Sequence, residues 1–236
     1  MEQSATELIN QAEQALLNEE WPKALDLYNR ALVQLDVKTA PEEAAEIENG
    51  RGVALLQLER YAEAIKALES ALLLVPDMAS AYYNLGITWE SMGNFENALH
   101  SYNKAIELEP HDAEAYFRRG GVWFQLEDFE KTLADATKTI ELHQGNILTG
   151  PYIARGLALY RLERYQEALK DFNKALEADP REAAEAFFYR ALVYIDIGQA
   201  LPARADLQAY LTMTEDLDGV LAEQAREIIA ELEKQA

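Results

Sequence analysis

The chain has 236 residues, of which 49% are hydrophobic or aromatic, so it carries enough apolar material to build a folded core. Asp and Glu number 42 against 21 Lys and Arg, which gives a formal net charge of −21. Such a charge repels phosphate backbones and anionic membranes, so we expect no nucleic-acid partner and no direct membrane insertion. The absence of cysteine excludes disulfides and thiol chemistry.

The N-terminal residues, MEQSATE, contain no basic segment and are followed by no long apolar run, so no signal peptide is expected. The apolar stretch 71–75 is too short to cross a bilayer. Only 11 Gly and 7 Pro are present, and Ala, Leu and Glu dominate, a mixture that favours helix. We therefore expect an all-α, cytoplasmic protein.

Apolar residues recur in six consecutive repeats, predicted at about 5–38, 45–78, 79–112, 113–146, 149–182 and 184–217. The first two repeats are separated by six extra residues. Within them, the run from Thr39 through Pro41 to Glu43 has proline near a first turn and acidic residues behind it, which predicts a helix beginning near Pro41.

The third repeat shows the pattern most clearly. Its first half places an apolar stripe at helical spacing, carried by Tyr82, Leu85, Gly86, Trp89 and Met92. Gly93-Asn94 then interrupts the helix. A second stripe of the same period follows, carried by Phe95, Ala98, Leu99, Tyr102, Ala105 and Ile106, and Pro110 closes the repeat. This arrangement predicts a helical hairpin.

The fourth repeat departs from this pattern. Thr132 and Thr139 occupy positions where the other repeats mostly have alanine, and Gln144 stands where proline is common. Gly145-Asn146 and Gly150-Pro151 punctuate a longer connection to the fifth repeat. Buried hydroxyls weaken helix packing unless they bond to the backbone. Two interpretations stay open, a bend in the stack and a merely loosened loop.

A final helix is predicted at about 217–235. Thr214 and Asp216 offer helix caps, and one apolar stripe follows at helical spacing, made of Leu217, Leu221, Ala225, Ile228, Ile229 and Leu232. A terminal helix of this kind covers the last hairpin and presents a polar face to water.

Two small residues mark each repeat. The first lies in the middle of the first helix: Ala12, Gly52, Gly86, Gly120, Gly156 and Ala191. The second lies early in the second helix: Ala24, Ala64, Ala98, Thr132, Ala168 and Ala203. A glycine inside a helix is unfavourable by about 1 kcal/mol relative to alanine. We expect it here because two helices approach closely, with Gly86 facing Ala98.

These offsets resemble the tetratricopeptide repeat, whose pattern is matched by Tyr82, Leu85-Gly86, Trp89, Ala98, Tyr102 and Pro110. The resemblance implies a right-handed α-solenoid, a single domain over 1–236, with six hairpins and a C-terminal capping helix. It also implies that the first helices line a concave groove, the usual ligand site of the family.

The repeat frame assigns fifteen residues to that groove, mostly apolar or aromatic with a few amides and two arginines. They are Asn49, Val53, Tyr83, Asn84, Ile87, Phe117, Arg118, Phe124, Gln125, Ile153, Leu157, Tyr160, Arg161, Phe188 and Tyr189. An exposed apolar patch usually marks an interface. The alternative is that these side chains pack against the next helix.

One subset of the family grips the C-terminal carboxylate of chaperone tails with Lys, Asn and Arg side chains. Asn84 and Arg118 match two of those positions. Asn49, Val53 and Glu114 occupy the others and lack the positive charge, so the resemblance implies an incomplete clamp.

Little of the sequence suggests catalysis. The three histidines, His100, His111 and His143, fall in a second helix, a turn and a helix end, without metal-ligand spacing. Neither a nucleophile elbow nor a phosphate loop is found. We expect no enzyme activity, no metal and no cofactor.

The leading hypothesis is an interaction scaffold or assembly factor that binds a peptide or helix of an unidentified partner protein in the groove. The alternatives are a self-assembling structural repeat protein and a sensor of peptides or small ligands.

Overall fold

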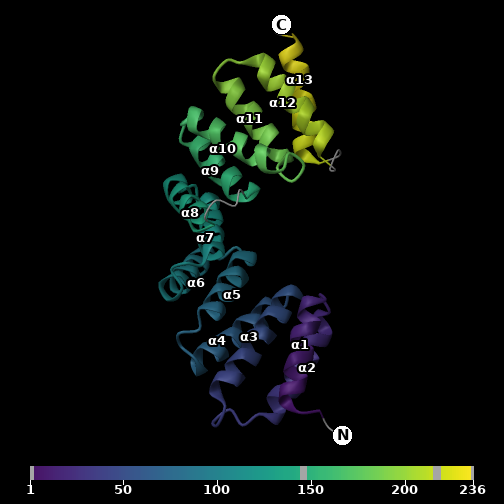
Figure 1. Cartoon of the computed structure of the whole chain (residues 1–236), viewed down its shortest axis with the longest axis vertical. Helices are drawn as coiled ribbons and strands as arrows, with labels where there is room; N and C mark the ends of the chain where they lie inside the picture. The colour runs from purple at the N-terminus through teal and green to yellow at the C-terminus, as the bar shows by residue number, and fades with distance from the viewer. Residues whose placement is uncertain (1–2, 144–147, 215–218, 235–236) are drawn as a thin grey trace. The chain divides into compact units, whose positions relative to one another are not determined.

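A computed structural model describes residues 3–143, 148–214 and 219–234, and these contain thirteen α-helices and no strand (Figure 1). The helices follow one another as six pairs and a final helix, which confirms the all-α hairpin prediction. The chain forms two compact units, unit 1 over residues 1–122 and unit 2 over residues 123–236.

Unit 1 contains three complete helix pairs and most of a seventh helix. The helices are α1 (Ala5–Leu17), α2 (Trp21–Gln34), α3 (Pro41–Gln57), α4 (Tyr61–Leu74), α5 (Ala79–Ser91), α6 (Phe95–Leu108) and α7 (Ala113–Gln125). Its largest cluster of buried side chains is formed by α1 to α4, and a second cluster joins α3 and α4 to α5.

Unit 2 begins within the last turn of α7 and contains the remaining helices. They are α8 (Phe129–Leu142), α9 (Thr149–Arg161), α10 (Tyr165–Ala178), α11 (Ala184–Asp196), α12 (Ala200–Met213) and α13 (Val220–Lys234). One buried cluster is centred on α9, α10 and α11, and another joins α11, α12 and α13.

The third helix begins where the sequence predicted. Ala40 is the N-cap of α3 and Pro41 is its first residue, while Glu42 and Glu43 lie in the first turn. Proline is well placed there because the first turn needs no backbone donor, and acidic side chains favour the positive end of the helix dipole.

Each hairpin turn contains one residue in the left-handed region, with φ between 57° and 76°: Glu19, Glu59, Gly93, Glu127, Glu163 and Gly198. These residues recur at the spacing of the repeats. A left-handed residue reverses the chain after a helix, and glycine adopts this conformation with the least strain. The break predicted at Gly93-Asn94 is thereby explained.

Gly86 makes the predicted close contact between helices, but the residue nearest to it is not the predicted one. A Cβ atom at Gly86 would lie 2.5 Å from the ring of Tyr102, so the nearest side chain that the glycine faces is Tyr102, in place of the predicted Ala98. Gly52 faces Leu68 and Gly156 faces Phe172 in the same way. The close approach therefore accommodates a large side chain within the hairpin, one turn further along the second helix than Ala98.

The threonines of the fourth repeat are buried, and their hydroxyls bond to the backbone. Thr132 donates to the carbonyl of Asp128 at 3.2 Å, and Thr139 donates to the carbonyl of Asp135 at 2.9 Å. These bonds satisfy the hydroxyls inside the packed region. Gln144 and Gly145-Asn146 lie outside the described residues, as does the predicted cap Asp216.

The last helix packs as predicted. Ala222 and Ala225 are fully buried against α11 and α12, and Leu221, Ile228, Ile229 and Leu232 pack around them. Leu217, the first member of the predicted stripe, is not among the described residues. No helix in the described part of the chain is long and apolar enough to cross a membrane.

Candidate functional site

Seven of the predicted groove residues belong to unit 1, and we call them the unit 1 face. α3 contributes Asn49 and Val53, α5 contributes Tyr83, Asn84 and Ile87, and α7 contributes Phe117 and Arg118. All seven are half-buried, so each is packed on one side and open to solvent on the other.

An amide pair joins two neighbouring first helices on this face. The Asn84 Nδ2 amide donates to the Asn49 Oδ1 oxygen at 2.9 Å, although the residues are 35 positions apart. Each amide group can both donate and accept. The hydrogen bond uses one donor of Asn84 and one acceptor of Asn49, so within the described part of the chain the Asn84 oxygen and the Asn49 amide protons are available to a ligand.

Tyr83, Arg118 and Glu114 form a second polar group on the unit 1 face. The Arg118 Nε atom lies 3.3 Å from a Glu114 carboxylate oxygen, and both charges are close enough to Tyr83 to influence its pKa. Burial raises the pKa of Tyr83, the charge of Glu114 raises it further, and Arg118 opposes both. The phenol is therefore held neutral, as a hydrogen-bonding group.

Below this surface, Tyr102 is fully buried and donates its hydroxyl proton to Glu90 at 2.5 Å. Burial is the main reason why the pKa of Tyr102 is far above its usual value, and the bond to Glu90 raises it further. The rings of Tyr83 and Tyr102 pack with their centroids 6.0 Å apart. The buried tyrosine thus supports Tyr83 from behind.

The unit 2 face contains Phe124, Gln125, Ile153, Leu157, Tyr160, Arg161 and Tyr189. The Arg161 guanidinium lies 4.3 Å from the centre of the Phe129 ring, and that ring packs edge-on against Phe124 at 5.5 Å. Burial, and after it the nearby carboxylate of Asp196, raise the pKa of Tyr160 to about 12. This surface is mostly apolar and aromatic, with Arg161 as its cation.

Phe188 does not belong to either face, which corrects the sequence prediction. It is only 3% exposed and packs its ring 5.7 Å from Tyr210 of α12. Tyr189 is partly buried as well, since its ring stacks on Phe172. For these two residues the alternative interpretation of packing against a neighbouring helix fits the contacts.

Sequence reasoning missed the polar clefts, of which two, one in each unit, are lined by corresponding residues. The first, with a volume of about 380 Å³, is lined by residues of α2, α3 and α4, among them Arg51, Arg60 and Lys66. The second, of about 350 Å³, is lined by residues of α8, α9 and α10, among them Arg155, Arg164 and Lys170. Neither cleft includes a predicted groove residue.

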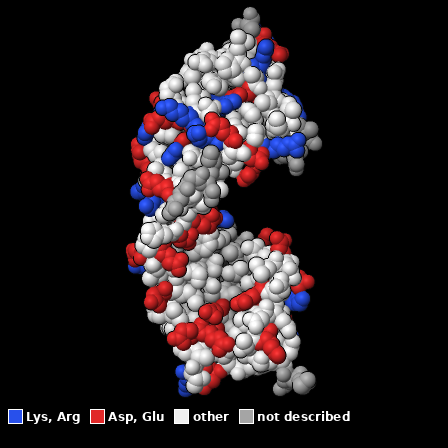
Figure 2. Space-filling model, in the orientation of Figure 1, with Lys and Arg blue, Asp and Glu red and all other residues white. Residues whose placement is uncertain are grey.

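Asp and Glu side chains outnumber Lys and Arg over the visible surface of unit 1 (Figure 2). Three cations that line one cleft are therefore unusual in this unit. A signal for the clefts exists in the sequence, because Leu-Glu-Arg-Tyr occurs at both 58–61 and 162–165. In the described residues no group of three or more His, Asp or Glu side chains could hold a metal ion.

The described chain consists of tandem helical hairpins. Each hairpin turn has a left-handed residue, and a small residue recurs opposite a large one, so the chain is a helical-repeat protein. Matches to family models show which kind of helical repeat it contains. Tetratricopeptide-repeat models match residues 79–112 and 151–182, and a further repeat model of the same family matches residues 52–93. The chain is therefore a tetratricopeptide-repeat protein, as its sequence pattern predicted. Such repeats generally mediate protein–protein interactions.

Solved structures share the fold at low identity. YrrB, described as a tetratricopeptide-repeat protein with an unusual peptide-binding site, is 22% identical with a TM-score of 0.69, over 85% of this chain and 97% of YrrB. A tetratricopeptide-repeat protein from Parabacteroides merdae is 21% identical with a TM-score of 0.72, and the match covers 99% of this chain and 92% of that protein. MamA is 21% identical with a TM-score of 0.65, and the match covers 71% of this chain and 96% of MamA. No protein of curated function matches the chain.

Proposed function

We propose that this chain is a non-catalytic interaction module whose unit 1 face binds an extended peptide segment of a partner protein. The observation that carries the proposal is the Asn49–Asn84 pair. A peptide group presents one N–H donor and one carbonyl acceptor. The pair offers the complementary acceptor on Asn84 and donor on Asn49, so it can hold the main chain of a ligand irrespective of its sequence.

Apolar side chains next to the amides supply the second element of recognition. Val53, Ile87 and Phe117 are half-buried on α3, α5 and α7, so part of each side chain is open to contact. Burying exposed apolar area stabilises a complex by about 25 cal/mol per Å² before the losses of association are subtracted. An extended ligand with apolar side chains flanking the clasped peptide group would fit this surface.

Arg118 orients an acidic or polar group of the ligand in this proposal. Its ion pair with Glu114 is exposed, with side-chain exposures of 43% and 54%. Exposed pairs contribute only about 0–1 kcal/mol, so the guanidinium can exchange Glu114 for a ligand carboxylate at little loss. The unit 2 face, with Arg161 among aromatic rings, is the second proposed contact surface.

A display library of random twelve-residue peptides tests this function even while the natural partner is unidentified. We expect enriched peptides whose affinity falls about tenfold or more for Asn84→Ala and for Phe117→Ala, the range of interface anchors. Melting temperatures should stay close to that of the unmodified chain, because both side chains are only half-buried.

Lys174→Ala is the matched control, since Lys174 is exposed to solvent on α10 and pairs only with Glu177 among the described residues. It should leave peptide affinity unchanged. The unit 1 face would be removed from the function if no peptide were enriched. The same would follow if the Asn84→Ala and Phe117→Ala variants bound the enriched peptides as tightly as the unmodified chain does.

A further inference from the structure

The two polar clefts occupy equivalent places in the second and fifth repeats. Arg51, Arg60 and Lys66 in unit 1 correspond to Arg155, Arg164 and Lys170 in unit 2 at one constant spacing along the chain. In both clefts the arginine at the turn forms a two-bonded ion pair with a glutamate three residues later, each bond 2.8 or 2.9 Å long. The clefts can therefore be compared residue by residue.

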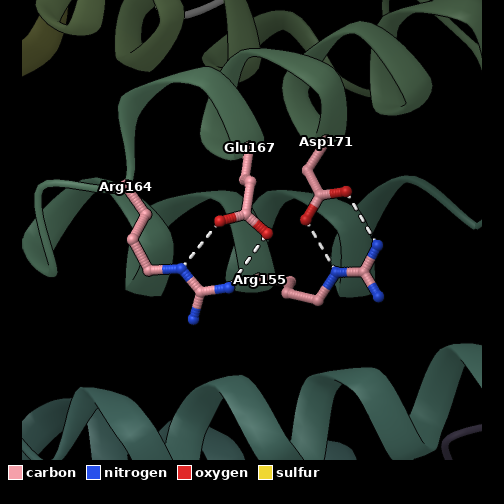
Figure 3. A network of polar contacts seen from close by, with 4 residues as sticks. All are labelled: Arg155, Arg164, Glu167 and Asp171. Atoms are coloured by element: carbon pink, nitrogen blue, oxygen red, sulfur yellow. Dashed lines mark hydrogen bonds and ion pairs between the residues drawn. The ribbon is translucent and has the colours of Figure 1, made fainter.

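In unit 2 the deeper arginine has a carboxylate partner of its own. Arg155 Nε lies 2.7 Å from Asp171 Oδ2, and its Nη2 lies 2.8 Å from Oδ1, so the two planar groups meet edge to edge (Figure 3). Arg190 and Asp206 in the sixth repeat form the same pair, with both bonds 2.7 Å long. The spacing is sixteen residues in each case.

Unit 1 lacks that carboxylate. The residue sixteen positions after Arg51 is Ala67, which is buried beside the cleft. Arg51 bonds through Nη1 to Glu48 at 2.5 Å, on the opposite edge of the guanidinium from the Nε atom. Among the described residues, Arg51 Nε is a buried side-chain atom without a hydrogen-bond partner.

We propose that the cleft between α2 and α4 binds a carboxylate group, which takes the place on Arg51 that Asp171 takes on Arg155. The ligand would use the Nε and Nη2 edge of the guanidinium, and Lys66 adds positive charge to the cleft, whereas the charge of Arg60 is balanced by Glu63. This site is independent of the proposed peptide surface, because it involves different side chains and its loss would leave the Asn49–Asn84 pair intact.

Physical chemistry favours a planar carboxylate over a spherical anion at this place. A guanidinium presents two parallel N–H donors, a fork that matches the two oxygens of a carboxylate. A buried donor without a partner is unfavourable, and a ligand that accepts from it removes that penalty. The Nε atom is shielded, so the guanidinium must turn slightly within the cleft as the carboxylate enters.

The carboxylate could come from a small dicarboxylate or from the acidic side chain of a peptide. Two probes separate these sources: succinate, and the tripeptide Gly-Asp-Gly with blocked ends. Each is titrated into ¹⁵N-labelled protein at constant ionic strength, with sodium chloride as the control anion. The Nε–H signal of Arg51, identified by its loss in Arg51→Lys, reports binding directly.

We expect at least one probe to move this signal to saturation, and the probe with the higher affinity identifies the source. Ala67→Asp should supply the missing carboxylate within the chain and weaken probe binding by about tenfold or more. Asp171→Ala, the reciprocal change, should make the Arg155 signal respond to the same probe.

Calorimetry on Arg51→Lys provides a second test that does not depend on the Ala67 variant. Lysine keeps the charge but removes the fork, so binding should again fall about tenfold or more. The proposal is overturned when neither probe shifts the Arg51 signal more than chloride does, or when Ala67→Asp and Arg51→Lys both bind the probe as tightly as the unmodified chain.

Discussion

At the scale of single residues, glycines in these helices serve different purposes, and the same substitution should have opposite effects. Gly86→Ala would place a Cβ atom 2.5 Å from the Tyr102 ring, so we expect a loss of about 1–3 kcal/mol in the free energy of unfolding. At Gly121 of α7 nothing lies within 4 Å of a Cβ atom. Gly121→Ala should therefore stabilise the protein by up to about 1 kcal/mol through helix propensity.

Urea unfolding followed by circular dichroism measures both variants under one condition. A change of the same sign at the two positions would contradict the assignment of Gly86 to a close helix contact, because the two substitutions differ mainly in what the new methyl group touches.

The residues of the unit 1 face were chosen from the sequence, and their binding role stays a prediction, but the sequence did not show how they pair. Helical spacing places Asn49 and Asn84 on first helices, yet their hydrogen bond depends on how two consecutive repeats pack. The error at Phe188 has a related cause. Successive residues of a helix point about 100° apart, so the spacing alone does not show which of Phe188 and Tyr189 turns inward, and only the packing against Tyr210 shows that Phe188 is the buried one.

At the scale of elements, the hairpin turn depends on one left-handed residue. Gly93 has φ of 71° and no atom within 4 Å of a Cβ position. Gly93→Ala should therefore destabilise the protein by about 1–2 kcal/mol through backbone strain alone. Glu59 occupies the equivalent place with φ of 57°, so Glu59→Gly should be neutral or stabilising by less than about 1 kcal/mol.

Thermal unfolding of these two variants checks the turn assignment. Equal destabilisation by both would show that the side chain at this position matters more than the backbone conformation.

The terminal helix α13 is a second element with a testable purpose. It covers Leu207 and Tyr210, which are 0% and 4% exposed in the cluster shared with α11 and α12. Deleting the residues after Met213 should expose this apolar surface, lower the melting temperature and promote self-association. Light scattering at several concentrations measures the association.

Glu231→Gln is the control for that deletion, since Glu231 lies exposed on the polar side of α13 and its change should have no effect. A truncated chain that stays monomeric and melts at the original temperature would show that α13 is an appendage and not a cap.

Helix boundaries could be predicted from the sequence where capping, proline or glycine residues mark them. Pro41 with Glu42 and Glu43 marked the start of α3, and Gly93-Asn94 marked a turn. The turns at Glu19 and Glu163 carry no glycine, so only the spacing of the repeats reveals them. The bonded Arg155–Asp171 pair was missed because a spacing of sixteen residues crosses from one helix to the next, outside any single-helix pattern.

At the scale of the whole molecule, the excess of 42 acidic over 21 basic residues should govern how stability responds to salt. Exposed pairs such as Lys104–Glu107 and Lys23–Glu20 contribute little each, and salt weakens them. Salt also screens repulsion among the carboxylates that have no cation to pair with, and these outnumber the pairs. Repulsion among the carboxylates therefore outweighs the ion pairs in the response to salt, and added salt should stabilise the fold.

We expect the melting temperature at neutral pH to rise by about 2–4 °C between 20 mM and 500 mM sodium chloride, which corresponds to about 1 kcal/mol for a chain of this size. Scanning calorimetry measures the rise, and glycerol at matched osmolality distinguishes screening from solvent exclusion. A fall in melting temperature would mean that the ion pairs outweigh the net repulsion. In that case the repeated arginine–carboxylate pairs, and not the apolar stacking of hairpins alone, would be a principal source of stability.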